Sequence, residues 1–224
     1  MGTPERLRRG RILRRLATIG GASVIAAFAA LSLSTSAAVA GAEQCESAPG
    51  ASLSASALIN EMFDGTLDCF NGWSDGLGIQ IQGLNAAQPG CASASASYES
   101  AQGGGIMMSA QAGLTDVQTT TKVKLKFFTA EQALFAKAKS LKKAKRKDVA
   151  HWLGEIVTDL PTVDTDFVAV YTDLQNVSRD LSSDDCDSAQ TDLTATSTAN
   201  TTASNSLATL AEDTSAVQSA LHKK

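Results

Sequence analysis

The apolar residues between positions 163 and 181 follow a strict spacing. They step by four and three residues in alternation over nearly three heptads, which places them on one helix face. They are Val163, Phe167, Val170, Leu174, Val177 and Leu181. A helix with one narrow apolar face buries it against other helices. This segment therefore predicts an all-α protein built as a helical bundle.

A second segment with the same spacing predicts a helix over residues 188–221. Its seam positions are Leu193, Thr196, Asn200, Ala203, Leu207, Leu210, Thr214, Val217 and Leu221. Residues 188–206 include ten serines and threonines, which lower helix propensity, so a Thr-rich linker is the alternative there. Turn-type residues over 182–186 separate the two helices.

A third long helix is predicted from residue 129 to about residue 160. Thr129 and Gln132 fit the first and fourth positions of a capping box, and Pro161 marks the end. The apolar stripe of this helix is Leu134, Ala138, Leu141, Val149, Trp152 and Ile156. Lys145 falls on the same stripe, where its aliphatic stem could pack while its amine reaches water.

Three long helices joined by short breaks favour antiparallel neighbours. A shorter helix over 52–67 and another near 106–121 complete an antiparallel four- or five-helix bundle, with residues 114–224 as its main part. The a/d seams could pack within one chain or between chains, so self-association is a second reading of the same pattern.

Glycine sets the first part of the chain apart. Twelve of the 17 glycines lie between residues 41 and 113, which predicts a Gly-rich loop region around the helix at 52–67. Residues 78–82 and 122–128 alternate apolar with other residues, which favours two short strands that could form a β-hairpin.

Residues 1–40 have the order of a secretory signal peptide: an Arg-rich start, an apolar run and an A-x-A pattern that ends at Ala40. Cleavage there predicts a secreted or cell-surface protein, and an uncleaved anchor is the alternative. The remaining chain has 13 lysines and arginines against 22 aspartates and glutamates, a net charge of −9.

Four cysteines remain after this cleavage: Cys45, Cys69, Cys91 and Cys186. An even number in an exported chain predicts two disulfides, and three pairings are open. A metal site is not expected, because no C-x-x-C spacing occurs and the only histidines are His151 and His222. No cofactor is indicated either.

The strongest candidate for a binding site is a run of cations. Residues 122–147 hold ten of the 13 cations of the mature chain. Five of them lie on one side of the predicted helix and are named here the basic cluster: Lys139, Lys142, Lys143, Arg146 and Lys147. Such a cluster on an exported protein favours an anionic cell-wall polymer or membrane surface as partner. Nucleic acid is disfavoured, since the mature chain is acidic and no aromatic residue interleaves the run.

The alternative for the basic cluster is internal neutralisation. Residues 148–192 contain eleven acidic residues and one cation, Arg179. In an antiparallel hairpin, part of this acidic segment could lie along the basic one, and surface pairs of that kind contribute little to stability.

Enzyme chemistry has little support in the sequence. Neither a G-x-S-x-G nor an H-E-x-x-H motif occurs, so no catalytic residue is assigned. We expect an exported, non-catalytic protein that binds through the basic cluster or through the Gly-rich first part of the chain. A membrane-active bundle, inserting Ile79–Ile81 and Gly103–Met108 as helical pore-forming toxins insert an apolar tongue, is the first alternative. A small secreted hydrolase with paired carboxylates is the second.

Overall fold

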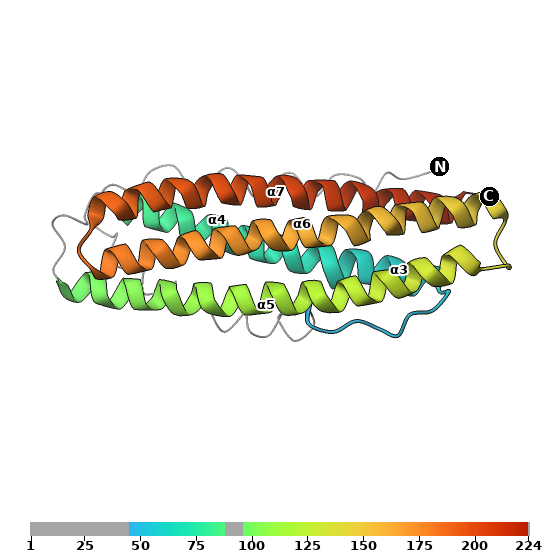
Figure 1. The fold of residues 1–224 in the computed structure, drawn as a ribbon, viewed down its shortest axis with the longest axis horizontal. Coiled ribbons are helices and arrows are strands. Elements are labelled where there is room, and N and C mark those ends of the chain that lie inside the picture. Colours follow the sequence, from blue (N-terminus) through green and yellow to red (C-terminus); the bar gives the residue numbers. More distant parts are fainter. Residues whose placement is uncertain (1–44, 88–95, 224) are drawn as a thin grey trace, which may run out of the picture. The chain divides into compact units, whose positions relative to one another are not determined.

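The computed structural model describes residues 45–87 and 96–223, and all regular structure within them is helical (Figure 1). These residues belong to one compact unit, Ala38–Lys224. The elements are α3 (Ala55–Met62), the π-helix η1 (Phe63–Leu67), α4 (Asp68–Ala87), α5 (Ala96–Lys137), α6 (Lys143–Ser182) and α7 (Cys186–His222). The prediction of an all-α bundle is confirmed. The predicted signal peptide, 1–40, lies outside the described residues.

Helix α6 packs against α5 on one side and α7 on the other, while α4 packs on α7. Residues later in α6 contact residues earlier in α7, so the two helices run antiparallel. The contacting pairs are Asp148 with Lys223, Asp166 with Ser206, and Asp180 with Asp192. Gln132 with Ala150 and Gly113 with Tyr171 give α5 and α6 the same antiparallel relation.

The two seams fold as predicted. Val163, Phe167 and Leu174 of the first seam are fully buried, and its residues pack inside this chain against the neighbouring helices. The Thr-rich half of the second seam is helical, with Leu193, Thr196 and Ala203 buried. Its hydroxyls donate to carbonyls four residues earlier, as at Thr196 and Thr198. Asp185 caps α7 by accepting a hydrogen bond from the Ser188 backbone N–H.

The two strands were wrong predictions, and so was the Gly-rich loop over residues 71–87 and 96–113; residues 88–95 lie outside the described part of the chain. Residues 78–82 lie in α4, and residues 122–128 lie in α5. Gly72, Gly76 and Gly78 sit where an added Cβ would meet nothing within 4 Å, so they face open space and leave the buried side of α4 to apolar residues. Spacing on the buried face, rather than glycine content, decides the structure here.

The predicted helix 129–160 is two helices with a turn between them. Thr129 is not a cap; it lies inside α5 and donates to the Leu125 carbonyl at 2.7 Å. The break over 138–142 falls where no large apolar residue is fully buried between Ala138 and Val149, and where like charges crowd the chain. Pro161 does not end a helix either, since it is exposed inside α6 between the buried Leu160 and Val163.

One disulfide joins Cys45 to Cys69, as one of the three open pairings allowed. Cys186 is disulfide-bonded as well. Cys91 lies outside the described residues. The Cys45–Cys69 bond fastens the segment before α3 onto α4.

Candidate functional site

The basic cluster occupies the turn between α5 and α6 and the first residues of α6. Lys139 and Lys142 lie in the turn, and Lys143, Arg146 and Lys147 lie in the start of α6. Arg146 is half-buried and the four lysines are exposed. Sequence reasoning found these residues but placed them along one helix face, whereas the turn gathers them at one end of two long helices.

The start of α6 adds positive potential to this cluster. Its N-cap position is Lys142, which makes no side-chain hydrogen bond to the helix, and the first turn has no acidic residue. The unpaired N–H groups of a helix start carry a partial positive charge. Helix and side chains therefore attract anions to the same place.

None of the five cations forms an ion pair with the part of the chain that the structure describes. Its ion pairs join Lys124 to Glu61, His151 to Glu155, Arg179 to Asp180, and Lys223 to Asp148. The acidic residues of 148–182 continue along α6 away from the cluster. In the described residues, the acidic segment 148–182 therefore forms no ion pair that neutralises the basic cluster.

The end of α7 contributes a residue that sequence reasoning missed. The Lys223 amine lies 3.0 Å from Asp148 Oδ2, and the Lys223 carbonyl accepts from the Lys145 amine at 3.1 Å. Asp148 follows the basic cluster directly in sequence, so Lys223 offsets the nearest negative charge. The predicted antiparallel pairing of the last two helices was the signal that could have indicated this contact.

Acidic side chains meet across α6 and α7 instead. Burial raises the pKa of Asp213 to about 6, helped by a hydrogen bond to Asp159 and by the charges of Asp159, Glu155 and Glu212. Near the other end of α6, burial and the neighbouring Asp180 raise the pKa of Asp192. Both pairs bring like charges together, and in the described residues only the Asp180–Asp192 pair has a cation beside it, Arg179 at 3.5 Å from Asp180.

Replacing Asp213 with asparagine should remove a pH dependence of stability. The raised pKa means that the folded protein holds this proton more tightly than the unfolded chain, so stability falls as pH rises from about 4 to about 6. After allowance for solvent screening of a half-exposed group, we expect the variant to be about 1 kcal/mol more stable than the native protein at pH 7.5. Thermal unfolding followed by circular dichroism measures this, as a rise of about 2–4 °C.

At a pH of about 3, below the Asp213 pKa in both the folded and the unfolded state, the Asp213→Asn variant and the native protein should unfold at nearly the same temperature, because Asp213 is then mostly protonated in both states. Asp75→Asn, which changes an exposed acid on α4, is the matched control and should show no such difference between the two pH values. An equal gain from Asp213→Asn at both pH values would contradict the explanation by like-charge contact.

The structure offers less support for a hydrolase site with paired carboxylates. An open depression of about 400 Å³ is lined by Pro49, Ala57, Asn60, Glu61, Asp64 and Gly65. It gathers two carboxylates, but that of Glu61 is held by the Lys124 amine at 2.6 Å. In the described residues, no group of three or more potential ligands is placed to hold a metal ion.

The segments proposed for membrane insertion lie within helices. Ile81 of α4 and Ile106 of α5 are buried in the bundle, whereas Ile79 and Met108 are exposed by 61% and 76%. Across residues 45–87 and 96–223, no helix combines the length and apolarity needed to cross a bilayer.

Comparisons with known proteins add no second line of evidence. No family model matches the chain, and neither does any curated protein or solved structure. The functional argument therefore rests on the residues and geometry described above.

Proposed function

We propose that the protein is an exported, non-catalytic helical bundle that binds an anionic polymer of the cell envelope through the basic cluster. The observation that carries this proposal is the gathering of five cations at the α5–α6 turn, none of them ion-paired to a described residue. An antiparallel bundle supports this role because its turns can bring charges together at one end.

Charge distribution favours a contact at this end of the bundle. The mature chain would carry a net charge of −9, so most of its surface repels a polyanion. The basic cluster and the start of α6 form the densest group of exposed cations in the described residues, and each cation near an anionic surface contributes about 1 kcal/mol. A repeating anion, such as a phosphate- or carboxylate-bearing wall polymer, can meet several cations at once.

Export is supported by the signal-like order of residues 1–40 and by the disulfides. Disulfides persist in oxidising compartments and are rare in the cytosol. The proposed site of action is the cell surface or the space outside it.

Co-sedimentation of residues 41–224 with purified cell-wall sacculi tests the proposal. We expect binding at 50 mM salt that fades by 300 mM, because salt screens exposed charges. Changing all five cations of the basic cluster to glutamine should weaken binding at least ~100-fold at low salt, given about 1 kcal/mol per cation.

A matched pair of variants separates position from total charge. Lys142→Gln/Lys143→Gln removes two charges from the basic cluster, and Lys122→Gln/Lys126→Gln removes two exposed charges from the middle of α5. Only the first pair should lose affinity. Equal losses, or unchanged binding by the five-residue variant, would overturn the assignment. Binding to anionic vesicles or to nucleic acid but not to sacculi would replace the proposed partner.

A further inference from the structure

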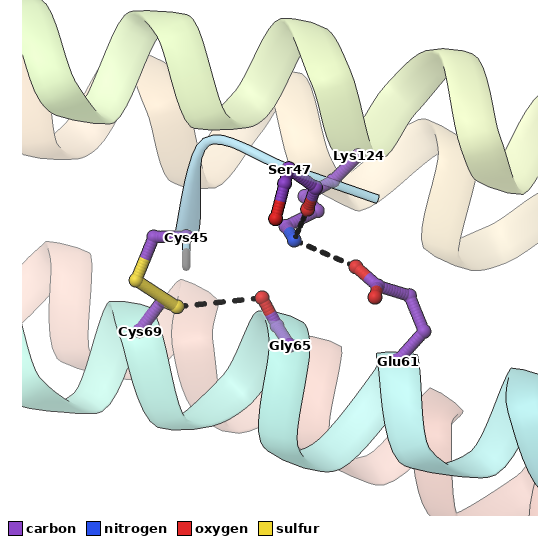
Figure 2. The surroundings of a disulfide bond; sticks show 6 residues. All are labelled: Cys45, Ser47, Glu61, Gly65, Cys69 and Lys124. Carbon is purple, nitrogen blue, oxygen red and sulfur yellow. Dashed lines mark hydrogen bonds and ion pairs between the residues drawn. A yellow bond between two sulfur atoms is a disulfide. The ribbon is translucent and has the colours of Figure 1, made fainter. Parts of the chain in front are cut away.

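The segment before α3, residues 45–54 and named here the strap, bridges two parts of the bundle. On one side are α3, η1 and α4, named here the arm, which packs on α7; on the other is α5, which packs on α6. The backbones of the arm and α5 approach each other closely at few points. Figure 2 shows the strap passing between them, with contacts to both.

Among the described residues, one disulfide and two hydrogen bonds join the strap to the arm and to α5. Cys45 is bonded to Cys69 of α4. The Lys124 amine of α5 donates to the Ser47 carbonyl at 2.5 Å. The Ser52 backbone N–H donates to Glu131 Oε1, also at 2.5 Å. The disulfide links the strap covalently to the arm, and two hydrogen bonds link the strap to charged residues of α5.

The two residues that hold the strap are charged groups inside the bundle. Lys124 is 0% exposed and Glu131 is 1% exposed. They lie seven residues apart on α5, which places them on one helix face. Glu61 of the arm neutralises the Lys124 amine at 2.6 Å, while Glu131 Oε2 has no hydrogen-bond partner and burial raises the pKa of this carboxyl. A buried charge is costly unless its partners stay in place.

We propose that the Cys45–Cys69 disulfide is a redox-sensitive latch that keeps Lys124 inaccessible. The reductant would be a dithiol: one thiolate attacks a sulfur of the disulfide, a mixed disulfide forms, and the second thiol resolves it. Cys45 and Cys69 leave as thiols and the dithiol becomes a disulfide, so atoms and electrons balance. Cys69 is partly exposed, which lets a reductant approach.

The effect of reduction is local because of where the attachments lie. Ser47 is two residues from Cys45, so cleavage of the disulfide removes the covalent bond nearest to the carbonyl that covers the Lys124 amine. Ser52 lies close to the start of α3, into which the strap continues. It therefore depends less on the disulfide for its position than Ser47 does. Helices α5, α6 and α7 share extensive buried contacts that do not involve the strap. The strap and its seam with α5 therefore open while these three helices stay folded.

Amine labelling of the full mature chain tests the latch independently of polymer binding. An N-hydroxysuccinimide ester of acetate is applied briefly, and the rate of acetylation at each lysine is read by peptide mass spectrometry. In the native protein, Lys124 should react at least ten times more slowly than the exposed Lys143. Cys45→Ser/Cys69→Ser should raise the Lys124 rate at least tenfold and leave that of Lys143 unchanged.

Cys91→Ser/Cys186→Ser is the matched control, since it removes the other two cysteines and leaves the strap attached. It should leave Lys124 slow to react. Reduction of the native protein by dithiothreitol should reproduce the Cys45→Ser/Cys69→Ser result, with helicity by circular dichroism retained. Slow Lys124 labelling in Cys45→Ser/Cys69→Ser, or fast labelling accompanied by loss of helicity, would overturn the proposal of a local latch.

Discussion

Replacing Lys124 with methionine is expected to lower the free energy of unfolding by about 3–5 kcal/mol. Lys124 is fully buried and its amine lies 2.6 Å from Glu61 Oε1 and 2.5 Å from the Ser47 carbonyl. Methionine fills much of the same volume but removes the two hydrogen bonds that the Lys124 amine donates to the Glu61 carboxylate and the Ser47 carbonyl. Urea denaturation followed by circular dichroism gives the change directly.

The double variant Lys124→Met/Glu61→Gln is the control for this interpretation. It removes both charges, so it should recover at least half of the lost stability, because replacement of a whole buried pair costs less than loss of one partner. Gly65 stays glycine in both variants, because an added Cβ would lie 2.6 Å from Glu61 Oε2 and would disturb the same side chain. A double variant as unstable as Lys124→Met would show that packing of the lysine stem, rather than charge pairing, is what matters.

The second large effect is expected at the contact between α5 and α6. A Cβ added to Gly113 would lie 2.4 Å from two ring carbons of Tyr171, whose side chain is buried and has little room to move. We expect Gly113→Ala to lower the free energy of unfolding by about 1–3 kcal/mol, even though alanine favours a helix by up to about 1 kcal/mol. Thermal and urea unfolding of the variant measure the change.

Gly76→Ala supplies the comparison for this prediction. Gly76 also lies inside a helix, but an added Cβ there meets nothing within 4 Å. This variant should be more stable than the native protein by about 0.5–1 kcal/mol, because only helix propensity changes. The prediction for Gly113 is wrong if both alanine variants are stabilised.

The helices at the end of the chain could be predicted because their buried positions are mostly apolar. Phe167, Leu174, Leu207 and Leu210 mark the helical period directly. Even the polar side chains of Thr196 and Thr214 fit the seam, because their hydroxyls donate hydrogen bonds to carbonyls of their own helix. The period was visible wherever side-chain type and burial agreed.

Helix α5 was misread because several of its buried positions are polar. Thr120, Thr121, Lys124 and Glu131 are buried at helical spacing together with Phe127 and Phe128. A helical pattern of apolar residues omits the polar members of this face. The apolar residues that remain over 122–128 alternate with lysines, as in a strand. Burial of Lys124 and Glu131 depends on the strap and the arm, which are distant in sequence. Local patterns cannot reveal that dependence.

The basic cluster was predicted by composition but its position was not. The turn over 138–142 contains neither glycine nor proline, the usual markers of a break. The turn coincides with a stretch in which no large side chain is fully buried between Ala138 and Val149. The contribution of Lys223 required the antiparallel register of α6 and α7. Both features come from packing between helices rather than from the local sequence.

Helix α6 has cations at its start and acidic residues at its end, so this helix has an electric dipole along its axis. Lys143, Arg146 and Lys147 lie at its start, while Asp180 ends the helix together with Asp184 and Asp185 of the following turn. Forty residues of helix separate these ends by roughly 60 Å. Near a negatively charged surface such a dipole experiences a torque that turns the basic end inward and the acidic end outward. Bound molecules would then stand upright, and their like-charged outer ends would repel one another and space them apart.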